Sequence, residues 1–147
     1  MRPAVAALAV YLVVLLALTF LPLNGAFRQS VVDIHLVPFK SIGLALRRGP
    51  GTQEFAVLIG NILAFVPLGV LVPIVLRRRS WLLVLGLALG LSVAIELGQL
   101  TISVLLDPGY RTTDIDDVIV NVFGAAVGYA AYLVAAALVE RAKPASG

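Results

Sequence analysis

Four long apolar segments constrain the fold of this chain more than any other feature of the sequence. They cover about residues 3–21, 55–76, 81–100 and 118–139. Each has close to the ~20 residues that a helix needs to cross ~30 Å of hydrocarbon at 1.5 Å per residue. Only 13% of the residues are charged, against about 25% in a soluble domain. We therefore expect an all-α, polytopic membrane protein, in which residues 1–147 form one domain with four transmembrane helices in a small antiparallel bundle.

The charge and cysteine content exclude several classes of function. The chain has no cysteine, so disulfides and thiolate metal ligands are excluded. The net charge of +3 would favour a nucleic-acid partner in a soluble protein, but here the basic residues lie between and outside the apolar segments. They are expected at the membrane surface, with membrane lipids as partners, no nucleic acid and no cofactor. The oligomeric state is left open.

The connection between the second and third segments predicts the orientation of the chain. It contains Arg77, Arg78 and Arg79, and short loops rich in arginine lie in the cytoplasm. Both termini are then cytoplasmic, and residues 26–54 and 102–116 face outward. The first segment is long for a cleaved signal peptide, so we expect it to be retained as a signal anchor.

The longest connection, residues 26–54, is too apolar for a solvated loop and too short and charged to span the membrane. One interpretation is an interfacial or re-entrant segment, with Phe39, Ile42 and Leu46 on one side of a helix and basic residues near lipid headgroups. The other is a loop that packs on the bundle. The sequence leaves both open.

Two polar stripes run along the third and fourth segments. The first stripe has spacings of four, three and four residues, which place its members on one face of a helix: Ser92, Glu96, Gln99 and Ser103. The second stripe follows the same pattern: Asp117, Asn121, Gly124 and Gly128. The two stripes are expected to face each other. Small residues four apart predict close helix packing, both at Gly124 and Gly128 and at Gly86 and Gly90.

Polar residues within the apolar segments are candidates for a binding site. A carboxylate such as Glu96 in hydrocarbon is either protonated or paired with a cation, for which Arg111 is the candidate. One interpretation is a buried network of Glu96, Arg111 and Asp117 that holds the helices together, with Asn61 in an interhelical hydrogen bond. The other is an outward-facing pocket that binds a ligand, lined by Asn61, Glu96, Gln99, Arg111, Asp114, Asp117 and Asn121.

The acidic run before the fourth segment has three interpretations. Its carboxylates can cap that helix, with Thr113 or Asp114 as the N-cap. A divalent cation bound by Asp114, Asp116 and Asp117 is chemically reasonable, although their spacing matches no specific metal motif. Acid–base chemistry would use Glu96 and Asp117 as the catalytic candidates. His35 is either an interface residue or, if its loop folds over the pocket, a proton carrier.

Taken together, several short motifs resemble the VanZ-like membrane proteins. The resemblance covers residues from about 30 to 130 and rests on Val37-Pro38-Phe39-Lys40-Ser41-Ile42, Asn61-Ile62-Leu63-Ala64-Phe65-Val66-Pro67-Leu68-Gly69, Glu96-Leu97-Gly98-Gln99 and Arg111-x-x-Asp114-Ile115-x-Asp117-x-x-x-Asn121-x-x-Gly124-x-x-x-Gly128-Tyr129. It implies a small bacterial protein of the inner membrane, in a family whose namesake is linked to resistance to the glycopeptide antibiotic teicoplanin. It implies no catalytic residue.

Four functions follow as expectations. The leading one is a protein that binds or acts on an amphiphile of the cell envelope, such as a cell-wall precursor or a lipoglycopeptide, and lowers susceptibility to glycopeptide antibiotics. The second is a membrane enzyme that uses Glu96 or Asp117 on a lipid-linked substrate, and the third is a purely structural membrane subunit. An ion-coupled carrier ranks last, because the cytoplasmic halves of the helices offer almost no polar path.

Overall fold

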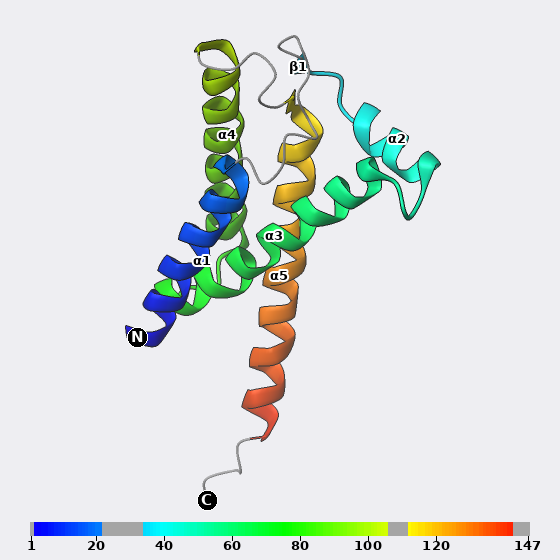
Figure 1. Ribbon diagram of the computed structural model, residues 1–147. Helices are drawn as coiled ribbons and strands as arrows, with labels where there is room; N and C mark the ends of the chain where they lie inside the picture. Colours follow the sequence, from blue (N-terminus) through cyan, green and yellow to red (C-terminus); the bar gives the residue numbers. More distant parts are fainter. Residues whose placement is uncertain (1, 22–33, 106–111, 143–147) are drawn as a thin grey trace, which may run out of the picture.

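A computed structural model describes residues 2–21, 34–105 and 112–142 (Figure 1). The long helices are α1 (Arg2–Phe20), α3 (Gln53–Leu76), α4 (Trp81–Leu105) and α5 (Ile115–Ala142). Between them lie the short helix α2 (Lys40–Arg48) and two short strands, β1 (Ile34–His35) and β2 (Thr113–Asp114). The 4 long helices are each apolar enough to cross a membrane, which confirms the predicted all-α, multi-pass architecture.

The helix boundaries differ from the predicted ones mainly where polar residues continue a helix. α4 ends at Leu105 rather than near Leu100, and α5 begins at Ile115 rather than near Val118. Hydropathy marks the part of a helix that faces hydrocarbon, whereas helical hydrogen bonding continues through polar residues such as Thr101 and Asp116. Sequence therefore located the spans correctly and placed these ends too close to the helix centres.

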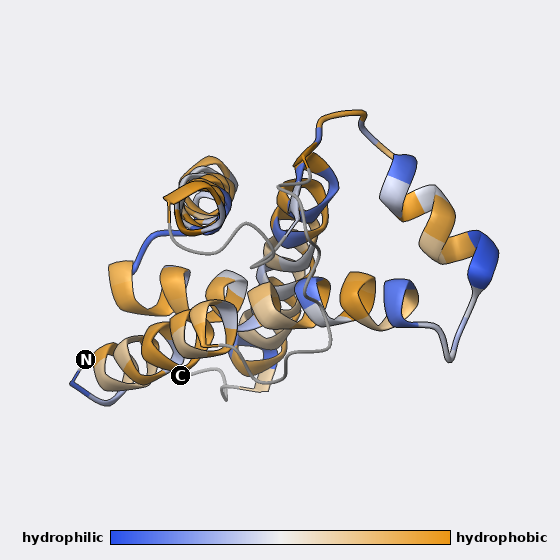
Figure 2. Cartoon of the chain, turned by 45° about the horizontal axis from the view of Figure 1, so that its top comes forward, coloured by the Kyte–Doolittle hydropathy of each residue, from blue (hydrophilic) through white to orange (hydrophobic). Residues whose placement is uncertain are grey.

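Successive long helices run in opposite directions through the bundle. The C-terminal ends of α1 and α4 and the N-terminal ends of α3 and α5 lie at the end that also holds α2, which we call the α2 end (Figure 1). The opposite end, the arginine end, holds the start of α1, the end of α5 and the connection between α3 and α4. The long helices are apolar over most of their length, and hydrophilic residues concentrate near helix ends and on α2 (Figure 2).

The most extensive helix contact is the crossing of α3 and α5, which depends on three glycines. A Cβ atom at Gly124 would overlap the carbonyl oxygen of Ile62, and one at Gly128 would overlap that of Val66. Gly69 of α3 is equally close to the backbone of α5. The predicted close approach at Gly124 and Gly128 is therefore present.

Gly86 and Gly90, which have the same spacing, make no such approach to another described helix. Both glycines lie on the exposed side of α4, and an added Cβ would meet nothing within 4 Å. α4 turns its other face inward, where Val84 and Ala88 are 0% exposed. Small residues at this spacing permit a close contact but do not determine which side of the helix makes it.

The core of the bundle is small, and much apolar surface faces outward. α1 packs on α3 through Leu15 and through a hydrogen bond from the Tyr11 hydroxyl to the carbonyl oxygen of Ala64, 2.8 Å long. Large apolar side chains are exposed along all four long helices, for example Val13 and Leu82. Such continuous apolar surface would promote aggregation in water and is the surface expected in contact with lipid.

α2 packs on the first turns of α3 and does not span the membrane. It has 9 residues, and Ala45 is its buried contact. The chain reverses between α2 and α3 at Gly49 and Gly51, whose φ angles of 76° and 94° favour glycine. Leu36, Val37, Phe39, Leu44 and Leu46 are exposed in and beside α2. The segment thus combines both interpretations from sequence, a packed helix with an exposed apolar side.

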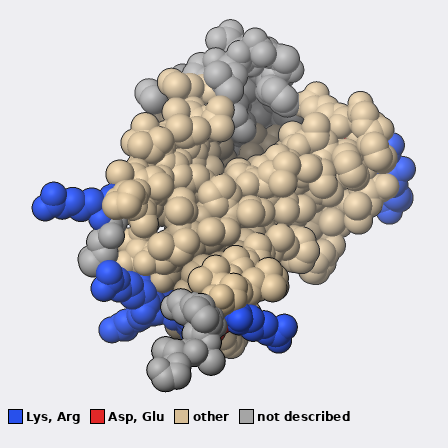
Figure 3. Space-filling view, turned by 90° about the horizontal axis from the view of Figure 1, so that it is seen from below, with Lys and Arg blue, Asp and Glu red and all other residues tan. Residues whose placement is uncertain are grey.

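The arginine end is strongly basic. Arg2, Arg77, Arg78, Arg79 and Arg141 are exposed there, and Lys and Arg side chains project from this face of the molecule (Figure 3). Arg79 donates a hydrogen bond to Glu140 of α5, and this bond raises the pKa of Arg79. The contact joins the connection between α3 and α4 to the last turns of α5.

Candidate functional site

Two adjoining cavities lie toward the α2 end of the bundle. The smaller, which we call the bundle cavity, has a volume of about 210 Å³ and lies between α1, α3, α4 and α5. The larger, the α2 cavity, has a volume of about 420 Å³ and lies between α2, α3 and the start of α5. Val57 and Asp117 line both cavities. The two therefore meet at the junction of α3 and α5.

The structure brings most of the predicted pocket residues together. The bundle cavity is lined by Asn61, Glu96, Gln99, Asp117 and Asn121. Asp114 lines the adjoining α2 cavity instead. Arg111 and the turn of residues 107–111 that was expected to carry it lie outside the described residues.

The two polar stripes meet at Asn121, whereas Gly124 and Gly128 of the second stripe pack on α3 instead. Asn121 Nδ2 of α5 donates a hydrogen bond to Ser92 Oγ of α4 over 2.9 Å. All four residues of the α4 stripe are buried, and Gln99 Nε2 donates to the Thr19 carbonyl oxygen of α1 at 3.4 Å. The other amide atom of Asn121, Oδ1, is buried and has no hydrogen-bond partner among the described residues.

Glu96 connects α4 to the start of α5. Its side chain lies between the helices with the residue 6% exposed, and its Oε2 accepts a hydrogen bond from the backbone N–H of Asp114 over 3.1 Å. A carboxylate oxygen that accepts a backbone N–H in a dry environment makes a strong, directional bond. Glu96 therefore holds β2 against α4 while it also lines the bundle cavity. The network of Glu96, Arg111 and Asp117 stays a prediction, because Arg111 lies outside the described residues.

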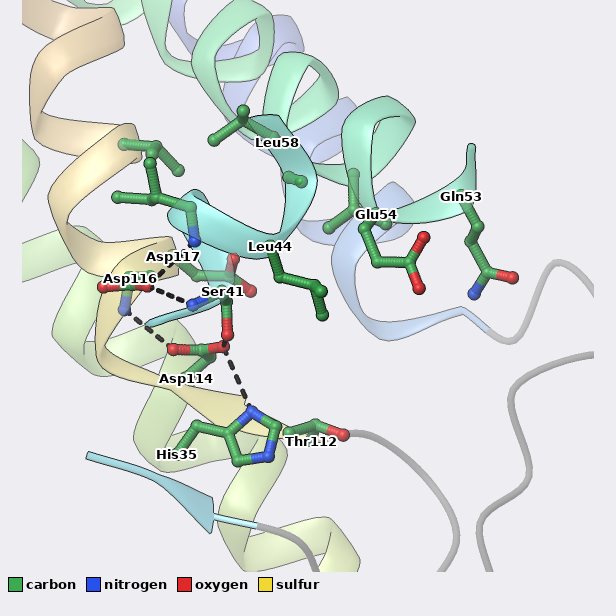
Figure 4. Close-up of a pocket in the computed structure, with 14 residues that line it drawn as sticks. His35, Ser41, Leu44, Gln53, Glu54, Leu58, Thr112, Asp114, Asp116 and Asp117 are labelled. Carbon is green, nitrogen blue, oxygen red and sulfur yellow. Dashed lines mark hydrogen bonds and ion pairs between the residues drawn. The ribbon is translucent and has the colours of Figure 1, made fainter. Parts of the chain in front are cut away.

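Asp114 links three elements at the rim of the α2 cavity (Figure 4). Its Oδ1 accepts from the Asp116 N–H over 2.9 Å, which is the N-cap bond that sequence anticipated for this helix. Its Oδ2 accepts a hydrogen bond from the Ser41 hydroxyl of α2 and lies 3.4 Å from His35 Nδ1. His35 is placed there because β1 pairs with β2 in parallel, with His35 opposite Asp114. This strand pairing was not predicted.

Asp116 has a role that sequence reasoning missed. The residue is 2% exposed, and its carboxylate accepts backbone N–H groups from Phe39 at 2.6 Å, Ser41 at 2.8 Å and Ile42 at 3.0 Å. These are the N–H groups at the start of α2, which a helix cannot satisfy internally. Phe39, the N-cap residue, has a φ of 65° and no side chain able to accept a hydrogen bond. A predicted helix whose N-cap position holds phenylalanine was the available signal that the cap comes from elsewhere.

The candidate metal ligands Asp114 and Asp116 already contact other groups of the protein. Both carboxylate oxygens of Asp116 point to α2, and those of Asp114 contact Ser41, His35 and the backbone of α5. Within residues 2–21, 34–105 and 112–142, no group of three or more His, Asp or Glu side chains is arranged to hold a metal ion. His35 lines the α2 cavity, and its function as a proton carrier stays a prediction.

The cavities combine carboxylates with apolar walls. The α2 cavity is lined by acidic groups of α3, β2 and α5 together with the apolar side chains of Ile42, Leu44, Val57, Leu58 and Val120. Figure 4 shows the residues that line it. In the described part of the chain, no Lys or Arg lines either cavity. Such a lining offers hydrogen-bond acceptors and negative charge beside hydrocarbon, which suits an amphiphilic ligand better than a wholly polar one.

Comparison with known proteins agrees with the motifs noted in the sequence. The model of the VanZ/LLP1 family matches residues 8–136, a range that includes all of α3 and α4, most of α1 and α5, and the residues that line both cavities. Searches of curated proteins and of solved structures gave no match. The family match covers most of the sequence, and the chain therefore belongs to the VanZ/LLP1 family.

Proposed function

We propose that this protein binds an amphiphile from the outer leaflet of the bacterial inner membrane. The observation that carries the proposal is the position of the two cavities side by side at Val57 and Asp117, which places a partly polar cavity between the long helices next to a larger cavity with apolar side chains. The headgroup of an amphiphile would occupy the bundle cavity, and its alkyl chain would lie along the apolar side chains of the α2 cavity. A cell-wall precursor or a lipoglycopeptide has this chemistry, and reduced glycopeptide susceptibility is an expected consequence.

The short helix α2 supports access from the membrane surface. Its exposed apolar residues, among them Phe39 and Leu46, stand beside Lys40, Arg47 and Arg48, all of them exposed. Apolar side chains next to basic ones are typical of segments that lie at the interface between headgroups and acyl chains. The α2 cavity opens beneath this segment, so a lipid at that depth could enter it without crossing the bundle.

The proposal requires the α2 end to face outward, with both termini in the cytoplasm. The basic arginine end favours this orientation under the positive-inside rule. Since the chain has no cysteine, single cysteines can report it. Thr112→Cys is expected to react with a membrane-impermeant thiol reagent in intact cells, and Ser80→Cys only after permeabilisation. The reverse pattern would place both cavities toward the cytoplasm and contradict an outer-leaflet ligand.

Asn61 offers the sharpest test of binding, because it lines the bundle cavity and its side chain makes no hydrogen bond to another described residue. Asn61→Leu should therefore leave the fold intact and remove one polar contact to the ligand. We expect the wild-type protein, purified in nanodiscs formed directly from cell membranes, to be enriched in one amphiphile relative to bulk lipid. Mass spectrometry should show that enrichment reduced about fivefold in Asn61→Leu, the factor expected for one hydrogen bond.

The control for this test is Leu63→Asn. Leu63 lies two positions further along α3 and is 61% exposed on the outer side of the bundle. Exchanging leucine and asparagine there, in the opposite direction, leaves the cavity unchanged. Equal lipid content in all three proteins would contradict the proposal. The same three proteins are also expressed in a teicoplanin-sensitive host, and the teicoplanin susceptibility of the three strains is compared. The proposal expects the wild-type protein to reduce it.

A further inference from the structure

The arginine end carries positive charge that the protein itself does not neutralise. Arg77, Arg78 and Arg79 follow α3, Arg141 lies in the last turn of α5, and all are exposed. Glu140 is the one acidic residue that the described part of the chain places at this end, and it accepts a hydrogen bond from Arg79. Within residues 2–21, 34–105 and 112–142, the other arginines named here have no ion pair.

The contacts of Arg79 hold these charges together at one end of the bundle. Arg79 donates hydrogen bonds to Glu140 and Tyr132, both of α5. The other arginines of the connection adjoin Arg79 in the sequence, and Arg141 adjoins Glu140, so these contacts bring the two basic segments together. Lys and Arg side chains project from this face (Figure 3). Like charges at short range repel one another, and an anionic partner would offset that repulsion.

Apolar side chains continue the basic surface onto the sides of the helices. Trp81 and Leu82, the first residues of α4, are 59% and 64% exposed, and Leu76, the last residue of α3, is 44% exposed. Tryptophan is enriched where lipid headgroups meet acyl chains. A soluble anion would contact the arginines alone. A phospholipid carries its phosphate next to its acyl chains, as the arginines stand next to the apolar residues, so it fits the whole surface.

We infer that the arginine end binds an anionic phospholipid, whose phosphate lies at Arg77 and Arg78 and whose acyl chains lie along Trp81 and Leu82. Clusters of basic residues beside a transmembrane helix attract anionic lipids, and arginine can donate two parallel hydrogen bonds to one phosphate. A phosphatidylcholine headgroup fits less well, because its own ammonium group offsets the phosphate charge. This surface lies at the opposite end of the bundle from both cavities. The inference is therefore independent of the proposed function, and either can fail without the other.

Trp81 is the only tryptophan of the chain, so its fluorescence reports the lipid beside it. The full-length protein is reconstituted into two vesicle samples with the same mixture of phosphatidylcholine and phosphatidylglycerol. In one sample only the phosphatidylcholine has brominated acyl chains, and in the other only the phosphatidylglycerol has them. Bromine quenches tryptophan fluorescence at close range. The quenching in each sample, corrected for the bulk fraction of the brominated lipid, therefore gives the relative occupancy of the two lipids at Trp81.

We expect phosphatidylglycerol to be preferred about fivefold at Trp81, the factor for one basic residue at an anionic membrane surface. Arg77→Gln combined with Arg78→Gln should remove this preference, and the corresponding pair of lysine substitutions, which keeps the charge, should retain it. The matched control is Lys40→Gln combined with Arg47→Gln. It removes two exposed positive charges at the α2 end and should leave the preference at Trp81 unchanged.

Four results would overturn the inference. Equal occupancy of the two lipids in the wild-type protein would show that the arginines select no anionic headgroup. A preference that survives removal of both Arg77 and Arg78 would show that they do not form the site. Loss of the preference when inorganic phosphate replaces chloride at the same ionic strength would show that the surface binds free phosphate. Absence of quenching by either lipid would show that Trp81 lies against protein, such as a second copy of the chain.

Discussion

Gly128→Ala is expected to destabilise the bundle more than any other single methyl group added to it. The new Cβ would overlap the carbonyl oxygen of Val66, which belongs to the backbone of α3 and cannot rotate away. Overpacking of a core typically costs about 1–3 kcal/mol, and we expect a loss of unfolding free energy at or above the upper end of that range. Reversible unfolding by sodium dodecyl sulfate in mixed micelles measures it.

Gly86→Ala is the matched control for this change. It adds the same methyl group to a long helix, at a position where the added atom meets nothing within 4 Å. Its unfolding free energy should stay equal to that of the wild type or rise slightly, because alanine favours helix. If both variants were equally stable, α3 and α5 would not cross as closely as the structure shows.

Asp116→Ala is expected to release α2 from the bundle. The substitution leaves the N–H groups of Phe39, Ser41 and Ile42 without their acceptor. Hydrogen bonds to a charged group are each worth about 1.5–3 kcal/mol, so the attachment of α2 should weaken by about 3 kcal/mol or more. Hydrogen exchange followed by mass spectrometry should show faster exchange across α2, with much less change in α3 and α5.

Two further variants distinguish the loss of the Asp116 cap from a general effect of removing a negative charge. Asp116→Asn keeps one carbonyl oxygen as an acceptor and should fall between the wild type and Asp116→Ala. Glu54→Gln removes a carboxylate from the same region, where Glu54 accepts a hydrogen bond from Arg48 at the surface. Exposed ion pairs contribute about 0–1 kcal/mol, so exchange in α2 should change little. Faster exchange of the same size in Glu54→Gln would contradict the assignment of Asp116 as the cap.

The cap by Asp116 and the crossing of α3 and α5 affect function because they shape the two cavities. The α2 cavity exists because α2 is held over the start of α5 by Asp116 and by the bond from Ser41 to Asp114. The bundle cavity exists because the glycine crossing fixes α3 against α5. The glycines of the crossing do not line the bundle cavity, so variants can test its shape and its lining separately. Ser41, Asp114 and Asp116, in contrast, both shape and line the α2 cavity.

Much of the site could be predicted from sequence because helix geometry is local. Apolar windows located the long helices, and the four-, three- and four-residue spacing from Ser92 to Ser103 identified the buried face of α4. A second stripe was predicted on α5, and the bond from Asn121 to Ser92 confirms its polar part, whereas its two glycines face α3. Polar side chains within hydrocarbon face the interior of the bundle, where they can contact one another.

The long-range contacts were decided only by the tertiary structure. Asp116 and the N–H groups that it caps are separated by 74 to 77 positions, and no local pattern relates them. Likewise, the spacing of Gly86 and Gly90 equals that of Gly124 and Gly128, yet only the second pair meets another backbone. The sequence by itself determined which segments are helical and which faces are polar, because both depend on neighbours along the chain. Which helix meets which face, and which side chain caps another helix, depends on packing between distant segments.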